Sequence, residues 1–153
     1  MKTLKKNNTG FSLVELIVVI LIMAIIAVAL APQVMKWVDQ SKVSTDVNNR
    51  ANLKSSMDAA VASYLAEGNK IKSGTKVFII DKNGFSGTDT TALKAVGDNF
   101  PSAVDEVTNM FWPEFKSSEN GYFQITILDN GAVKVEVYGG VSGADYGDGR
   151  TQP

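Results

Sequence analysis

The chain begins with a long apolar stretch and then changes to a mixed apolar and polar pattern. The run Leu16–Ala31 contains no polar side chain. Counted from Phe11 to Ala31, the segment would measure about 31 Å as an α-helix, which matches the roughly 30 Å hydrocarbon core of a bilayer. The first part of the chain is therefore predicted to be a helix long enough to cross a membrane.

Beyond Pro32 the apolar residues recur three or four positions apart, as on one face of a helix. They are Leu53, Met57, Ala60, Val61, Tyr64 and Leu65, preceded by Val43 and Val47. Because Gly68 is a helix stop signal, the pattern predicts one helix from Phe11 to Glu67. Proline removes a backbone hydrogen bond from a helix, so we expect a kink at Pro32.

Two pairs of opposite charges lie four residues apart in the amphipathic half. Asp46 is paired in this way with Arg50, and Lys54 with Asp58. Side chains at this spacing meet on a helix surface and form ion pairs. Both pairs are therefore predicted to support the exposed side of the helix.

The remaining residues are predicted to form short strands and helices. Alternating residues predict a hairpin from Tyr122–Leu128 and Ala132–Tyr138, because Asn130-Gly131 between them is a strong turn signal. A further strand is predicted at Lys76–Asp81, and short helices at Thr91–Val96 and Ser102–Met110, the latter with Ser102 as its N-cap. The Gly- and Asp-rich tail, residues 139–153, is predicted to be loop. Together these elements predict an α+β fold with a small antiparallel sheet of three or four strands on the long helix.

Glu15 is a carboxylate at the start of the apolar run. A charged group in the hydrocarbon core costs roughly 2.5–3.5 kcal/mol on insertion scales. Three lysines lie in the first ten residues, at positions 2, 5 and 6, which predicts a cytoplasmic N-terminus. Glu15 therefore needs a partner or a function.

Two ordinary interpretations of this segment leave some of its residues unexplained. A secretory signal peptide cleaved after Ala31 fits the sequence Ala29-Leu30-Ala31, but Pro32 would then follow the cleaved bond. That interpretation also places Glu15 within the apolar region. An uncleaved membrane anchor is the second interpretation, and it leaves Glu15 without a role.

The amino-acid composition limits the chemical functions that the chain can have. The chain has no cysteine and no histidine, which excludes disulfides, thiol nucleophiles and the commonest general base and metal ligand. The net charge of −1 would become −4 if the first ten residues, with their three lysines, were removed. A mildly acidic body argues against nonspecific nucleic-acid binding. Motifs for enzymatic catalysis are absent, and neither a cofactor nor a metal site is predicted.

The sequence Gly10-Phe11-Ser12-Leu13-Val14-Glu15 resembles the processing site of type IV prepilins and pseudopilins, with a short basic leader before it and a long apolar run after it. The resemblance implies that a prepilin peptidase cuts between Gly10 and Phe11 and methylates the amine of Phe11. It also implies that Glu15 pairs with the Phe11 amine of a neighbouring subunit during assembly. Pro32 agrees with the family pattern, in which many members have a proline about twenty residues into the mature helix.

This resemblance implies a division of the chain into four parts. They are a removed leader (1–10), an apolar helix for the membrane and filament core (11–31), an amphipathic helix half (32–68) and a globular head (69–153) that contains the 122–138 hairpin. The shape would be the lollipop of pilins. The implied function is that of a structural type IV pilus subunit in adhesion, motility, aggregation or DNA uptake.

The implied partners are copies of the same chain, the prepilin peptidase, the cytoplasmic membrane before assembly, and an inner-membrane platform with its ATPases. The precursor would lie in the bacterial cytoplasmic membrane with its N-terminus inside, and the filament would lie outside the cell. One alternative is a pseudopilin of a type II secretion or competence system, which shares the motif. Another is a secreted or anchored binding protein that forms no polymer.

The tail leaves two further points open. Asp145, Asp148 and Gly149 faintly resemble the calcium loop of major pseudopilins, although a solvated turn is favoured. Many pilins close their C-terminal region with a disulfide, which this chain cannot form. We therefore expect hydrogen bonds, packing or filament neighbours to hold this region.

Overall fold

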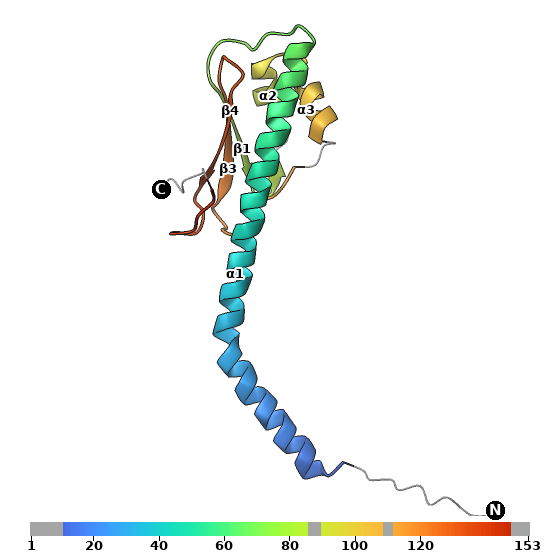
Figure 1. Ribbon diagram of the computed structural model, residues 1–153, viewed down its shortest axis with the longest axis vertical. Helices are drawn as coiled ribbons and strands as arrows, with labels where there is room; N and C mark the ends of the chain where they lie inside the picture. The colour runs from blue at the N-terminus through green and yellow to red at the C-terminus, as the bar shows by residue number, and fades with distance from the viewer. Residues whose placement is uncertain (1–10, 86–89, 109–111, 148–153) are drawn as a thin grey trace, which may run out of the picture. The chain divides into compact units, whose positions relative to one another are not determined.

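The computed structural model describes residues 11–85, 90–108 and 112–147 (Figure 1). The chain divides into two compact units, residues 1–38 and 39–153. Within these residues the elements are one long helix, two short helices and a small antiparallel sheet, which confirms the predicted α+β fold. Three predicted features lie outside the described residues: the leader with Gly10, the end of the second short helix at Met110, and the tail beyond Gly147.

The long helix, α1, runs from Leu13 to Ala66 and has 54 residues. The sequence pattern predicted both of its ends to within two residues. Pro32 lies inside the helix. By length and composition α1 is able to cross a membrane. None of the most apolar stretch of this helix is buried within the structure.

The sheet has four strands in the order β2-β1-β3-β4, all antiparallel. They are β1 (Lys76–Asp81), β2 (Gly84–Phe85), β3 (Tyr122–Ile127) and β4 (Val133–Tyr138). The predicted hairpin is thereby confirmed. Its turn needs Gly131, because this residue has a backbone φ of 82°, which residues other than glycine rarely adopt.

The inner face of the sheet and one face of α1 form the core. On α1, Leu53, Met57, Ala60, Val61 and Tyr64 are buried as the spacing predicted. Alternate residues of the strands meet them, with Phe78, Ile125 and Val135 in register across β1, β3 and β4. Leu65 was predicted to belong to this face but is exposed. It lies over the β3–β4 turn at Gly131, at the end of the sheet, where water reaches it.

Two short helices connect β2 to β3 in sequence, α2 (Thr90–Val96) and α3 (Phe100–Thr108). The predicted N-cap at Ser102 is wrong, because α3 begins two residues earlier and Ser102 lies exposed within it. Pro101 belongs to the first helical turn, where its missing N–H costs no hydrogen bond. The ring of Phe100 packs edge-on against Tyr64 at a centroid distance of 5.5 Å, which joins α3 to α1.

Candidate functional site

The motif at the start of α1 is organised around the Glu15 carboxylate. Ser12 donates its backbone N–H to Glu15 Oε2 at 2.9 Å, and Leu16 donates to the Ser12 carbonyl at 3.2 Å. Glu15 thus satisfies a backbone donor at the helix N-terminus, where the helix dipole also favours a negative charge. The spacing Ser-x-x-Glu before an apolar run is a capping-box signal that was present in the sequence but not used in the prediction.

The first unit presents an apolar surface on every side of its helix. All large apolar side chains from Phe11 to Val38 are exposed, with exposed fractions between 41% and 85%. Such a surface is too extensive for a protein monomer in water and requires lipid or other helices around it. The structure therefore presents Phe11 and Glu15 at the tip of a helix built for burial in a larger assembly or in a membrane.

Comparison with known proteins agrees with this geometry. Residues 5–31 match a family model described as the prokaryotic N-terminal methylation motif. The chain is also 28% identical, over 115 residues, to the type IV major fimbrial protein FimA of Dichelobacter nodosus; the match covers 72% of this chain and 71% of FimA. The search of solved structures returned no match.

These two likenesses together support the recognition of this chain as a type IV pilin. The motif identifies the N-terminal segment, and the fimbrial relative extends the likeness over most of the chain. The long helix followed by a small antiparallel sheet is the pilin-like arrangement. The second unit of this pilin is held together without cysteine.

Asp46 holds one loop of the pilin head, and the prediction that it lies on the exposed side of the helix is wrong. Its side chain is fully buried on α1. Oδ1 accepts the backbone N–H of Lys116 at 2.8 Å, and Oδ2 accepts that of Ser117 at 2.7 Å. Both carboxylate oxygens are thus used to satisfy main-chain donors of the loop before β3. The second predicted pair is confirmed, since Lys54 and Asp58 form an exposed ion pair at 2.7 Å.

Arg50, one turn further along α1, holds the C-terminal region. Its Nε donates to the Tyr146 carbonyl at 2.8 Å, and a terminal guanidinium nitrogen donates to the Val135 carbonyl at 3.1 Å. Arg50 is partly buried, so its predicted place on the exposed side of the helix is also wrong. The contact at Val135 also satisfies a carbonyl of β4, which is the last strand of the sheet.

Tyr146 links the C-terminal region after β4 to the loop before β3. Its ring is fully buried, although it lies in the tail that was predicted to be simple loop. Its hydroxyl is 2.6 Å from Ser117 Oγ and accepts the N–H of Val141 at 3.0 Å. We call Asp46, Arg50, Ser117 and Tyr146 the C-terminal clamp. A lone aromatic residue in a Gly- and Asp-rich stretch was the only sequence signal for this anchor.

An exposed ion pair adds a weaker connection to the loop before β3, which Asp46 also holds. Lys82, after β1, pairs with Glu119, and this hydrogen bond and the accompanying charge attraction raise the pKa of Lys82 and lower the pKa of Glu119. Because both side chains lie in water, screening leaves such a pair little weight in stability. The buried carboxylate of Asp46 therefore dominates the attachment of this loop.

Removing the Tyr146 hydroxyl tests the clamp. We expect Tyr146→Phe to lower the free energy of unfolding by about 1–2 kcal/mol, because the Val141 N–H and the Ser117 hydroxyl lose a buried partner. Tyr138→Phe on the outer face of the sheet is the control and should change stability by less than about 0.5 kcal/mol. Denaturant unfolding of the full chain in detergent measures both. Equal effects of the two variants would contradict the role of the clamp.

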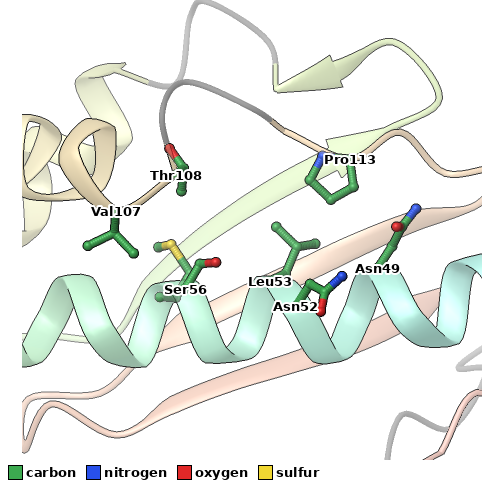
Figure 2. Close-up of a pocket in the computed structure, with 8 residues that line it drawn as sticks. Asn49, Asn52, Leu53, Ser56, Val107, Thr108 and Pro113 are labelled. Carbon is green, nitrogen blue, oxygen red and sulfur yellow. The ribbon is translucent and has the colours of Figure 1, made fainter.

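A cavity of about 140 Å³ lies between α1 and the residues Val107, Thr108 and Pro113 (Figure 2). Its walls are partly apolar, from Leu53, Met57 and Val107, and partly polar, from Asn49, Asn52, Ser56 and Thr108. Small-molecule sites usually measure about 300–1,000 Å³, so this cavity is too small to hold an ordinary substrate. It gives no support to an enzymatic function.

Metal binding finds no support within the described residues. In residues 11–85, 90–108 and 112–147, no three Asp or Glu side chains gather closely enough to hold an ion. The carboxylate of Asp145 instead accepts the N–H of Gly147 at 2.8 Å, as in an ordinary Asx turn. The other two residues of the faint calcium pattern, Asp148 and Gly149, lie outside the described residues.

Proposed function

We propose that this protein is the structural subunit of a type IV pilus, which polymerises through its N-terminal helix into an extracellular filament. The observation that carries the proposal is the methylation motif at the start of a helix whose large apolar side chains are all exposed as far as Val38. Likeness to a major fimbrial protein over 72% of the chain supports the proposal of a pilus subunit, and a pseudopilin remains the alternative. The role is structural rather than catalytic.

Processing begins between Gly10 and Phe11. A prepilin peptidase in the membrane removes residues 1–10 and methylates the new amine of Phe11. Glycine suits the cleaved position, because the absence of a side chain leaves the scissile carbonyl open and the backbone free to bend. The exposed Phe11, just before α1, is consistent with access by such an enzyme.

Assembly then pairs the Phe11 amine of one subunit with Glu15 of its neighbour. Phe11 precedes Glu15 by about one helical turn, so the two charges lie at nearly the same depth. In a medium of low dielectric constant the pair attracts strongly, while either charge alone is costly. The carboxylate keeps acceptor capacity for this partner, since the Ser12 N–H occupies only one of its several lone-pair sites.

The subunit lies in the cytoplasmic membrane before it is assembled. The basic leader remains on the cytoplasmic side, and residues 39–153 lie outside. An inner-membrane platform and its ATPases lift the subunit into the filament, with the apolar helices (11–31) in the core and the heads on the surface. A kink at Pro32 adapts the helix to this packing. Adhesion, motility, aggregation and DNA uptake are the functions that such a polymer serves.

Intact-mass and N-terminal analysis of the protein from its host tests the proposal. We expect a chain that begins at Phe11 and is one methyl group heavier than its sequence. A chain that begins at Met1 or Pro32 would overturn the processing step. Immunogold electron microscopy tests the product, and labelled surface filaments are expected. A correctly processed chain confined to the cell envelope would instead identify a pseudopilin.

Blocking the cleavage site gives a second check. We expect Gly10→Val to reduce the amount of mature protein by about tenfold or more, because a branched side chain displaces the scissile bond from the catalytic groups. Thr9→Val, one residue earlier, is the matched control and should be processed normally. An immunoblot that separates precursor from mature chain measures both. Normal maturation of Gly10→Val would show that the cut lies elsewhere.

A further inference from the structure

A groove of about 550 Å³ lies between the start of the second unit on α1 and the loop after β4. Its apolar lining includes Val43, Val141 and Ala144, and its carboxylates are Asp39 and Asp145. The described residues that line it include no lysine or arginine. The groove is therefore an apolar surface bordered by negative charge.

The opposite end of the second unit is basic. The loop between α1 and β1, residues 67–75, contains Lys70 and Lys72 against one acidic residue, Glu67, and Lys76 follows the loop directly. Lys72 pairs with Asp98 at 2.7 Å, which holds the pKa of that carboxyl below its ordinary value. Lys70 is exposed and forms no ion pair with any residue in the described ranges. This end therefore has positive charge in excess of its local partners.

These two ends lie far apart on the same rigid helix. From Ser44 to Ala66, α1 rises by about 33 Å, which places the groove and the basic loop at opposite ends of the second unit (Figure 1). A contact between two different surfaces of identical copies is heterologous. Such a contact adds copy after copy in an open row instead of closing into a dimer. The arrangement thus suits a polymer.

We propose that the groove of one copy receives the α1–β1 loop of a second copy. In this contact the aliphatic stem of Lys70 covers Val43 and Val141, and its ammonium group lies near Asp39 and Asp145. The inference rests on the proposed filament function and specifies which surfaces of the heads meet. It concerns contacts between heads, so it is independent of the pairing between Glu15 and Phe11.

Engineered cysteines test the contact, because the natural chain contains none. The double variant Ser73→Cys/Ser142→Cys places one thiol on the loop tip and one at the groove. After mild oxidation of isolated filaments, we expect a ladder of dimers, trimers and higher species on denaturing gels. A heterologous contact requires both cysteines in each copy for this ladder. Either single variant, and the control Ser73→Cys/Asn52→Cys, should give no ladder.

The outcomes separate this inference from the proposed function. Filaments that form normally but give no ladder with the double variant would overturn the head contact and leave the pilus function intact. Absence of filaments from the natural chain would overturn the pilus function itself. Should the double cysteine variant fail to assemble, the charge variants below decide the question.

Charge reversal in the loop provides that second measurement. Lys70→Glu should reduce filament yield by about fivefold at low salt, because the loop then meets like charges in the groove. Asp145→Asn removes charge from the groove while an amide oxygen can still accept the Gly147 N–H. Added to Lys70→Glu, it should restore about half of the lost yield. An unchanged yield for Lys70→Glu, or no recovery in the double variant, would overturn the contact.

Discussion

Replacement of Glu15 by alanine should reduce filament assembly by about tenfold or more while leaving removal of the leader intact. The physical reason is that, in the proposed assembly, the Phe11 amine created by cleavage would enter an apolar core without its counter-ion. Leaving one member of a buried pair alone costs about 3–5 kcal/mol, and 1.4 kcal/mol corresponds to a factor of ten. Filament mass per cell, measured after shearing, and an immunoblot of the mature chain give the two results.

Glutamine at the same position separates the observed capping contact of Glu15 from its proposed pairing with the Phe11 amine. Its amide oxygen can still accept the Ser12 N–H and preserve the start of α1, but it has no charge. We expect Glu15→Gln to be nearly as defective in assembly as Glu15→Ala. Ser12→Ala keeps both the backbone donor and the carboxylate, so it should assemble. Normal filament yield from Glu15→Gln would mean that the carboxylate serves only to cap the helix.

Removing the Asp46 carboxylate should destabilise the head by about 2–5 kcal/mol. Asp46→Ala leaves the backbone N–H groups of Lys116 and Ser117 without their buried acceptor, and each such loss costs about 1–3 kcal/mol. Asp46→Asn should be almost as damaging, because its amide offers one acceptor oxygen where two are needed and turns an NH₂ group toward a donor. Denaturant unfolding of the full chain in detergent measures both.

The matched control lies on the same helix. Asp58 stands four residues from a lysine, as Asp46 stands four residues from an arginine, but the Lys54–Asp58 pair is exposed. Asp58→Ala should therefore cost less than about 0.5 kcal/mol. A loss for Asp46→Ala as small as that for Asp58→Ala would refute the role of the buried carboxylate.

This contrast marks how far the sequence could predict the structure. The ends of α1 were predictable because a continuous helical pattern is bounded by a polar motif and by Gly68. The hairpin was predictable because period-two strands flank Asn130-Gly131. Side-chain periodicity reports only local geometry, however, and Asp46/Arg50 and Lys54/Asp58 have the same local spacing. Which pair is buried depends on where distant loops cross the helix.

The candidate site divides in the same way. The motif from Gly10 to Glu15 could be recognised because its residues are contiguous and each has a local chemical reason. The C-terminal clamp could not, because its members come from positions 46, 50, 117 and 146 and meet only through the fold. Ser102 was wrongly predicted to cap α3 because Pro101 allows the helix to begin earlier. Tertiary contacts determined each of these cases.

The clamp also attaches the loops of the head to α1 without any disulfide. Its attachments to α1 are hydrogen bonds from Asp46 and Arg50, and the chain has no thiol that an oxidase or isomerase could act on. Docking of these loops on α1 therefore needs no thiol-exchange step. The finished subunit has no disulfide for extracellular reductants to break. Aerobic and anaerobic conditions thus give a chain with the same, disulfide-free connectivity.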